Sequence, residues 1–164
     1  MQPGIAQRVY MGALGEFGGT AILENDGIRL EEIPEHFEKF DAKIVGLPVY
    51  VDFKNWHRNL SGRRGSKSDA APEREPETSR DKALRNSNKI ADCECVVILN
   101  LIADSNTADL RITDERMSNG KRLVMIPSLL NKSHPEQISK EALQKLHALV
   151  GEYTAQVENC AKEE

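Results

Sequence analysis

The residues from Ser61 to Ser87 constrain the fold of this chain more than any other segment. The stretch reads SGRRGSKSDAAPEREPETSRDKALRNS, with charges of both signs, two prolines and Leu84 as its single large apolar residue. Such a composition buries too little apolar surface to offset the conformational entropy lost on ordering. The sequence therefore predicts a disordered, charged linker over residues 61–87. It predicts two compact units beside the linker, at residues 1–60 and 88–164.

Charge and cysteine content limit the class of protein. The net charge of −4 over 164 residues argues against an overall electrostatic clamp for nucleic acid. The linker is the basic block of the chain, and Arg63 and Arg64 lie in its densest part. Three cysteines make no disulfide framework and fit a reducing compartment. With no signal-peptide pattern and no apolar run long enough to span a bilayer, a cytoplasmic protein without membrane association is expected.

The first unit is predicted to be a small β-barrel. Its element order, three meandering strands, a short helix and a return strand, resembles an OB-fold, a partly open barrel that commonly binds oligonucleotides. An SH3-like barrel and an open hairpin sheet are alternatives. The strands are expected at residues 5–14, 20–24, 28–33 and 41–53, with turns at Gly18-Gly19 and Asn25-Asp26-Gly27, helical turns at 34–40 and a bend at Gly46 and Pro48.

An OB-type surface suggests a binding site for single-stranded DNA or RNA. Such a site needs aromatic rings on which bases stack and cations that contact phosphates. A structural role is the alternative for the rings, because Tyr50 and Phe53 lie on opposite faces of one strand and Trp56 is placed to cap the barrel. The predicted nucleic-acid-binding residues are Arg8, Tyr10, Tyr50, Lys54, Trp56, Arg58, Arg63 and Arg64, with Phe17 as a further exposed ring.

The second unit is predicted to be an antiparallel sheet with one long packed helix, which makes the whole chain α+β. Strands are expected at 90–103, 110–113 and 122–126, with a tight turn at Asn119-Gly120. The helix begins near Ser133 or Ser139 and carries an apolar stripe that so small a sheet covers poorly. The stripe is therefore predicted to form a homo-oligomer or to bind a protein partner. Its residues are Leu143, Leu146, Leu149, Val150, Tyr153 and Val157.

Several short motifs of the second unit resemble one known family. They are Asp109-Leu110-Arg111-Ile112, then Asn119-Gly120, then Leu123-Val124-Met125-Ile126-Pro127-Ser128, then His134-Pro135 and the helix that holds Tyr153. Over roughly residues 95–155 these motifs resemble the SpoVG family of small bacterial nucleic-acid-binding regulators. The resemblance implies a strand-rich dimer with a packed C-terminal helix.

Catalytic motifs are sparse. Asp52-Phe53-Lys54 has the Asp-x-Lys spacing found in some nucleases, and Asp41 lies upstream, but a three-letter pattern is also common by chance. Cys93-x-Cys95 lacks the further paired ligands of a zinc site, so buried structural cysteines are expected. No pattern indicates a nucleotide or flavin cofactor, so neither a cofactor, nor a metal, nor a catalytic residue is predicted.

The function expected from the sequence is that of a non-enzymatic nucleic-acid-binding accessory or regulatory protein, acting on single-stranded DNA or RNA. The alternative is an adaptor or inhibitor that binds a protein partner through acidic surfaces and the C-terminal helix. Salt-dependent binding to a single strand distinguishes the two, because each phosphate contact releases counterions.

Overall fold

The computed structural model describes residues 15–54, 77–102, 111–131 and 133–164. Within them, strands from both predicted units form one open, mixed sheet of six strands in the order β1-β2-β3-β4-β6-β5. No described helix has the length and apolar character needed to cross a bilayer. The elements are a helix over 15–25, β1 (Leu30–Glu31), β2 (Ala42–Ile44), β3 (Val49–Lys54), α2 (Ser79–Asn88), β4 (Cys95–Asn100), β5 (Thr113–Arg116), β6 (Arg122–Ile126) and α3 (Lys140–Glu163).

The centre of the sheet is parallel and buried on both faces. Strand β4 pairs in parallel with β3 over six residue pairs and with β6 over five. Its sequence, CVVILN, is a continuous apolar run that ends in a polar residue, and all six side chains are buried. Such runs are typical of strands covered on both faces, whereas one-sided strands alternate between apolar and polar residues. Antiparallel strands β2 and β1 extend one side of the sheet, and β5 extends the other.

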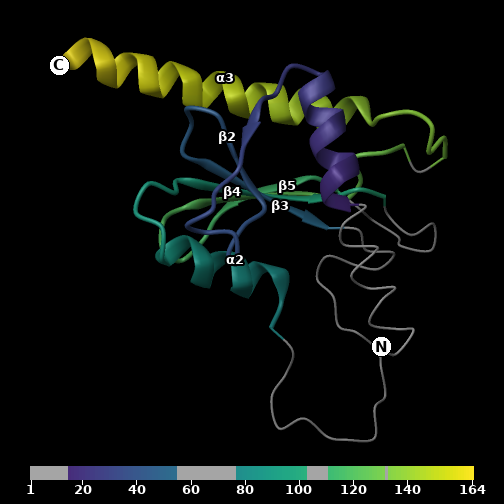
Figure 1. The fold of residues 1–164 in the computed structure, drawn as a ribbon, viewed down its shortest axis with the longest axis horizontal. Helices are drawn as coiled ribbons and strands as arrows, with labels where there is room; N and C mark the ends of the chain where they lie inside the picture. Colours follow the sequence, from purple (N-terminus) through teal and green to yellow (C-terminus); the bar gives the residue numbers. More distant parts are fainter. Residues whose placement is uncertain (1–14, 55–76, 103–110, 132) are drawn as a thin grey trace, which may run out of the picture.

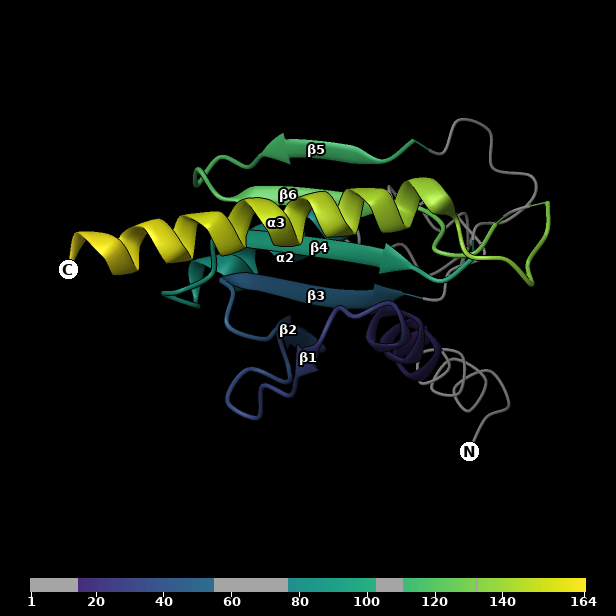
Figure 2. The same ribbon diagram turned by 90° about the horizontal axis from the view of Figure 1, so that it is seen from above.

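Helices cover both faces of the sheet. In Figure 1, α3 and the helix of residues 15–25 lie on one side and α2 lies on the other. The first face holds a core that includes Leu23, Val51, Val97 and Leu146. The second core includes Ala83 of α2 together with Ile98. Figure 2 shows α3 running along the sheet above β4 and β6, with its C-terminal end projecting beyond the strands.

The predicted OB-like barrel is wrong, because the sheet is open and its first described element is helical. Residues 20–24, expected as a strand, lie inside the helix of residues 15–25, and Gly18-Gly19 is not a turn. Gly19 faces the sheet so closely that a Cβ there would come 2.4 Å from the ring of Phe53. Close packing on β3 thus outweighs the low helix propensity of glycine. The strand expected at residues 5–14 lies outside the described residues.

Two turns expected in the first unit are present, but the second does not join the two strands predicted for it. The bend expected at Gly46 and Pro48 is the turn between β2 and β3, and Gly46 has a φ of 74°. Gly27 also has a positive φ, of 84°, but it follows a helix rather than joining two strands. This is the usual place for glycine after the last helical turn.

The predicted disordered linker is wrong over residues 79–87, which lie in α2. Thr78 is the N-cap of this helix, and its hydroxyl accepts a hydrogen bond from the backbone N–H of Asp81. The Asp81 carboxylate accepts in return from the backbone N–H of Thr78. This reciprocal capping box, together with burial of Ala83, stabilises a helix that composition alone did not indicate. Residues 61–76 of the predicted linker lie outside the described residues.

The second unit is partly as expected. Strand β6 has the predicted bounds, Gly120 of the β5–β6 turn has a φ of 81°, and α3 starts after an N-cap at Ser139. The sheet is not purely antiparallel, however, because β4 is parallel to β6. Strand β5 occupies the edge and pairs with β6 alone, and this places β6 beside β4.

Candidate catalytic site

The β2–β3 hairpin brings two carboxylates together. Ala42 pairs with Val51 in antiparallel register, so Asp41, one residue before Ala42, lies beside Asp52, one residue after Val51. The backbone confirms the alignment, because the N–H of Asp41 donates to the carbonyl of Val51. The turn at Gly46 fixes this register, since its left-handed conformation suits glycine. Two acids that are 11 positions apart in sequence therefore meet at one point of the sheet.

Lys54 completes a compact polar group on β3. Side chains alternate across a strand, so Asp52 and Lys54 share the face covered by α2, and Phe53 points to the opposite core. The Lys54 ammonium lies 2.8 Å from a carboxylate oxygen of Asp52. The group stands at the carboxyl end of the parallel strands, where Lys54 pairs with Asn100 of β4. Open α/β sheets commonly bind ligands at this edge.

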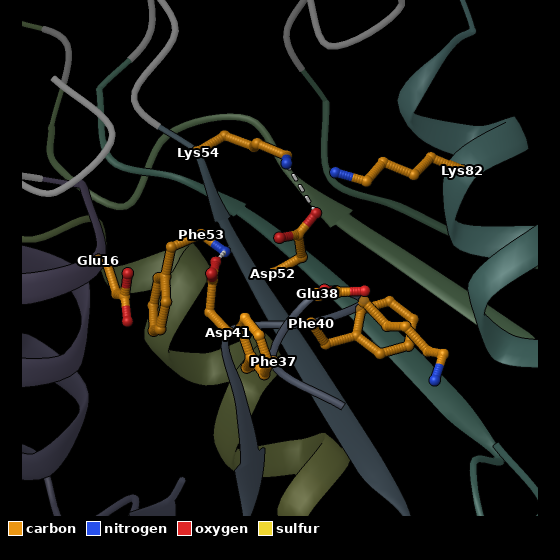
Figure 3. A pocket seen from close by; sticks show the side chains of 10 residues that line it. Glu16, Phe37, Glu38, Phe40, Asp41, Asp52, Phe53, Lys54 and Lys82 are labelled. Carbon is orange, nitrogen blue, oxygen red and sulfur yellow. Dashed lines mark hydrogen bonds and ion pairs between the residues drawn. The ribbon is translucent and has the colours of Figure 1, made fainter. Parts of the chain in front are cut away.

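A cleft of about 230 Å³ opens in front of these side chains. Figure 3 shows Asp41 and Asp52 on its floor, Glu16 directed inward from the helix of residues 15–25, and Lys82 directed inward from α2. Turn residues between β1 and β2 form a further wall. The complete lining is Glu16, Phe37, Glu38, Lys39, Phe40, Asp41, Asp52, Phe53, Lys54 and Lys82.

The electrostatic environment of Asp41 is unusual. Burial and the negative charge of Asp52 are the two main causes that raise the pKa of Asp41 to about 7, and the charge of Glu16 adds to them. A hydrogen bond of 2.7 Å from the backbone N–H of Phe53 to the Asp41 carboxylate opposes this shift. Adjacent like charges in a partly buried cleft are costly unless a cation or a proton compensates them.

This arrangement fits a small divalent cation. Among the described residues, no three His, Cys, Asp or Glu side chains are grouped so that they enclose a metal ion by themselves. Mg²⁺ does not require such a cage, because it usually keeps several waters and takes one or two protein carboxylates together with substrate phosphate. Asp41 and Asp52 would supply two carboxylates, and a bound cation would offset the burial and the charge of Asp52 that raise the pKa of Asp41.

The residues predicted to bind nucleic acid have different locations. Lys54 lies in the cleft. Tyr50 is 3% exposed, its ring packs against Phe40 and its hydroxyl donates to Asp92, so it offers no free face for a base. The remaining predicted residues, Arg8, Tyr10, Trp56, Arg58, Arg63 and Arg64, lie outside the described residues.

The predicted interface stripe of α3 mainly packs on the protein's own sheet. Leu146, Leu149 and Tyr153 are at most 4% exposed and belong to the core beneath the helix. Val157, in contrast, is 43% exposed and lines a groove together with residues of the turn between β2 and β3. Leu143 and Val150 are intermediate. Homo-oligomerisation or partner binding through α3 stays a prediction, and it rests on the half-buried and exposed members of the stripe.

Cys93 and Cys95 are buried, as the sequence predicts for structural cysteines. Cys93 and Cys95 are free and buried, and burial raises their pKa values to about 11 and about 12. Thiols with such values are mainly protonated at neutral pH and are therefore poor nucleophiles and metal ligands.

The sequence shows Asp41, Asp52 and Lys54 as a pattern that is common by chance, so no catalytic residue is predicted from it, and it gives no direct indication of Glu16 or Lys82. Glu16 was overlooked because Gly18-Gly19 was interpreted as a turn, and Lys82 because its helix was assigned to the linker. Two signals were present in the sequence. Glycine and apolar residues recur every four positions at 15, 19 and 23, and Thr78 precedes Asp81 by the three positions of a capping box.

Comparisons of the chain with protein-family models, with curated proteins and with solved structures find no significant match. The chemistry of the cleft is therefore the basis for assigning a function.

Proposed function

We propose that this chain is a divalent-metal-dependent phosphodiesterase that hydrolyses nucleic acid. The observation that supports this best is the meeting of Asp41 and Asp52 across one hairpin, with Lys54 2.8 Å from Asp52. Two carboxylates that can hold Mg²⁺, with an adjacent ammonium, form one set of groups that supports phosphodiester hydrolysis. The Asp-x-Lys spacing found in some nucleases is here accompanied by a second carboxylate, Asp41, on the neighbouring strand.

Each group has a role in the proposed reaction. Asp41 and Asp52 would hold the metal ion, which when bound would supply Lewis-acid chemistry for the phosphate and for the attacking water. The Phe53 N–H fixes the orientation of Asp41. The Lys54 ammonium stabilises the negative charge that develops on the phosphate oxygens. Hydrolysis adds water across one P–O bond and produces a phosphate monoester and a hydroxyl group.

Lys82 and Lys39 give the cleft further positive charge for the flanking phosphates. Both residues line the cleft beside the carboxylates, and they come from α2 and from the β1–β2 turn. The net charge of the chain is −4, so attraction of a polyanion depends on such local cations. This proposal keeps the nucleic-acid ligand expected from the sequence but replaces the expected non-enzymatic role with catalysis.

A cleavage assay tests the proposal. We expect the full chain to cut end-labelled DNA or RNA oligonucleotides in Mg²⁺ or Mn²⁺ and to leave them intact in EDTA. Asp52→Asn and Lys54→Met should each reduce the rate by about 100-fold or more, a typical loss when a group that stabilises the transition state is removed. Glu31→Gln is the matched control, because Glu31 also pairs with a lysine but lies outside the cleft lining.

Two outcomes of these assays would contradict the proposed phosphodiesterase activity. Cleavage that survives unchanged in Asp52→Asn would assign the activity to a contaminant or to another site. Metal-independent binding of nucleic acid without any cleavage would instead favour the non-enzymatic binding protein.

A further inference from the structure

One wall of the cleft carries an exposed aromatic ring. Among the described residues the large apolar side chains exposed to solvent are Phe17, Phe37, Val45 and Val157. Of these four, Phe37 alone lines the cleft that contains Asp41 and Asp52, and it is 71% exposed. Figure 3 shows its ring beside the floor of the cleft, close to Asp41.

The backbone that carries Phe37 is held in place, so its exposure does not result from a loose turn. The N–H groups of His36, Lys39 and Phe40 all donate to carbonyls within the same turn. Phe40 anchors the turn because its side chain is 2% exposed and its ring centroid lies 5.6 Å from that of Tyr50. The fold thus buries Phe40 and leaves Phe37, three residues earlier, open to the cleft.

Charges of both signs line the cleft beside this ring, with four acidic side chains and three lysines. Lys39, Lys54 and Lys82 line the same cleft from the turn, from β3 and from α2. An aromatic face next to cations is the combination that binds single-stranded nucleic acid, because bases stack on the ring while ammonium groups contact the phosphates. In a duplex both faces of an internal base are already covered by neighbouring bases, so the ring has no face to bind.

From this arrangement we propose that the cleft selects unpaired nucleic acid and that Phe37 stacks on a base next to the phosphate that a cation at Asp41 and Asp52 would bind. This inference rests on the proposed phosphodiesterase function for its substrate class. It adds a specificity residue that touches no reacting atom. Preference for DNA or RNA is not part of the recognition, since both have bases of the same shape.

Binding measurements in Ca²⁺ in place of Mg²⁺ test the inference separately from catalysis, because Ca²⁺ also takes carboxylate oxygens but coordinates them at longer distances and with a less regular geometry than Mg²⁺. Fluorescence anisotropy would compare the full chain on a labelled single-stranded DNA, a single-stranded RNA and a blunt duplex of the same sequence. We expect at least tenfold tighter binding to one or both single strands than to the duplex. Phe37→Ala should weaken single-strand binding by about 5- to 150-fold, the range expected for loss of one stacked base.

Two variants serve as controls. Phe17→Ala removes a ring that is 76% exposed but does not line the cleft, so its affinity should stay within twofold of the wild type. Phe37→Tyr keeps the aromatic face and should restore most of the binding. Both phenylalanines are exposed, so neither change should disturb folding, and circular dichroism checks this.

Equal affinity for single strand and duplex, or an unchanged affinity in Phe37→Ala, would overturn the inference. In that case metal-dependent cleavage that is lost in Asp52→Asn would still support the phosphodiesterase. Conversely, binding that depends on Phe37 without cleavage would retain the stacking role and reject the catalytic one.

Discussion

At the scale of single residues, the site depends on Asp41. The pKa of this carboxyl is raised from 3.8 to about 7, mainly by burial and by the charge of Asp52. Between those two values the native chain holds a proton at Asp41 that the unfolded chain has released. Without metal, this residue therefore makes the free energy of unfolding fall as the pH rises from about 4 to about 7.

Asp41→Asn should remove this pH dependence. The amide carries no charge, and its oxygen can still accept the hydrogen bond from the Phe53 N–H. We expect the variant to be more stable than the metal-free wild type at pH 8 by about 1–4 kcal/mol, the upper value being the full pKa shift without solvent screening, and to match it near pH 4. Urea denaturation at several pH values measures the difference. A variant less stable than the wild type at pH 8 would contradict the proposed repulsion.

Asp114 is a useful comparison, because its pKa shifts in the opposite direction. Hydrogen bonds from Arg122 lower the pKa of Asp114 to about 2. Its contribution to stability is present above its unfolded pKa and is lost as the pH falls through the lower value. The two acids therefore act in separate pH ranges, and the range above pH 4 reports on Asp41.

At the scale of elements, the helix of residues 15–25 is held against β3 by glycine. A Cβ at Gly19 would lie 2.4 Å from the Phe53 ring, whereas a Cβ at Gly18 would lie 3.5 Å from Leu101, an ordinary contact. Gly19→Ala should lower the free energy of unfolding by about 1–3 kcal/mol through overpacking. Gly18→Ala should be neutral or raise it by up to about 1 kcal/mol through helix propensity. Equal effects in urea denaturation would contradict this packing.

The stability of α2 depends on its N-cap residue, Thr78. Thr78 satisfies the N-terminal backbone of α2, which carries Lys82 into the cleft. Thr78→Ala should therefore cost about 1 kcal/mol of stability, and Thr78→Ser should retain most of it. Thermal unfolding of both variants provides the measurement. An unchanged midpoint in Thr78→Ala would show that α2 is held by its packing alone.

Elements with a strong local signal were predictable from the sequence. The apolar face of α3, the Asn119-Gly120 turn and the bend at Gly46 correspond to observed structure, because each is encoded within a few neighbouring residues. The helices of residues 15–25 and 79–88 were not predicted, since their stability comes from contacts with distant strands. Gly18 and Gly19 made the helix of residues 15–25 resemble a turn. The scarcity of apolar residues made the helix of residues 79–88 resemble a linker.

The sequence contains the residues Asp41, Asp52 and Lys54 as a short pattern, but it does not show that the fold brings them together. Asp-x-Lys is too short a pattern to distinguish from chance, and its meaning depends on the hairpin register that places Asp41 beside Asp52. Reading that register outward from the Gly46 turn would have brought the two acids together. Glu16 and Lys82 required knowledge of which helices pack beside the hairpin, and this is a property of the tertiary structure.

At the scale of the whole molecule, the two halves that composition suggested share one sheet. Strand β3 from the first half pairs with β4 from the second over six residue pairs at the sheet centre. The core beneath α3 combines side chains from both halves, including Val51 and Leu146. The candidate site also extends beyond the first half, because its carboxylates lie there and Lys82 lies on α2, in the segment predicted to be a linker.

Fragments test this dependence. A chain divided between β3 and α2, as residues 1–60 and 77–164, should give two pieces that are largely unfolded alone and that form a folded complex when mixed. The reason is that each piece exposes a central strand that is buried on both faces in the intact chain. Circular dichroism of the separate and mixed fragments is the measurement. Native-like cooperative unfolding of residues 77–164 alone would contradict the shared core.

The central claim is that Asp41 and Asp52 hold a divalent cation for phosphodiester hydrolysis. Calorimetric titration of the full chain with Mn²⁺ at pH 6.5, in two buffers of different ionisation enthalpy, tests it most directly. We expect a saturable site that releases a proton on binding, because the cation replaces the proton that the raised pKa of Asp41 retains. Asp52→Asn should abolish this binding and Glu31→Gln should preserve it. No saturable binding in the wild type, or equal affinity in Asp52→Asn, would contradict the account.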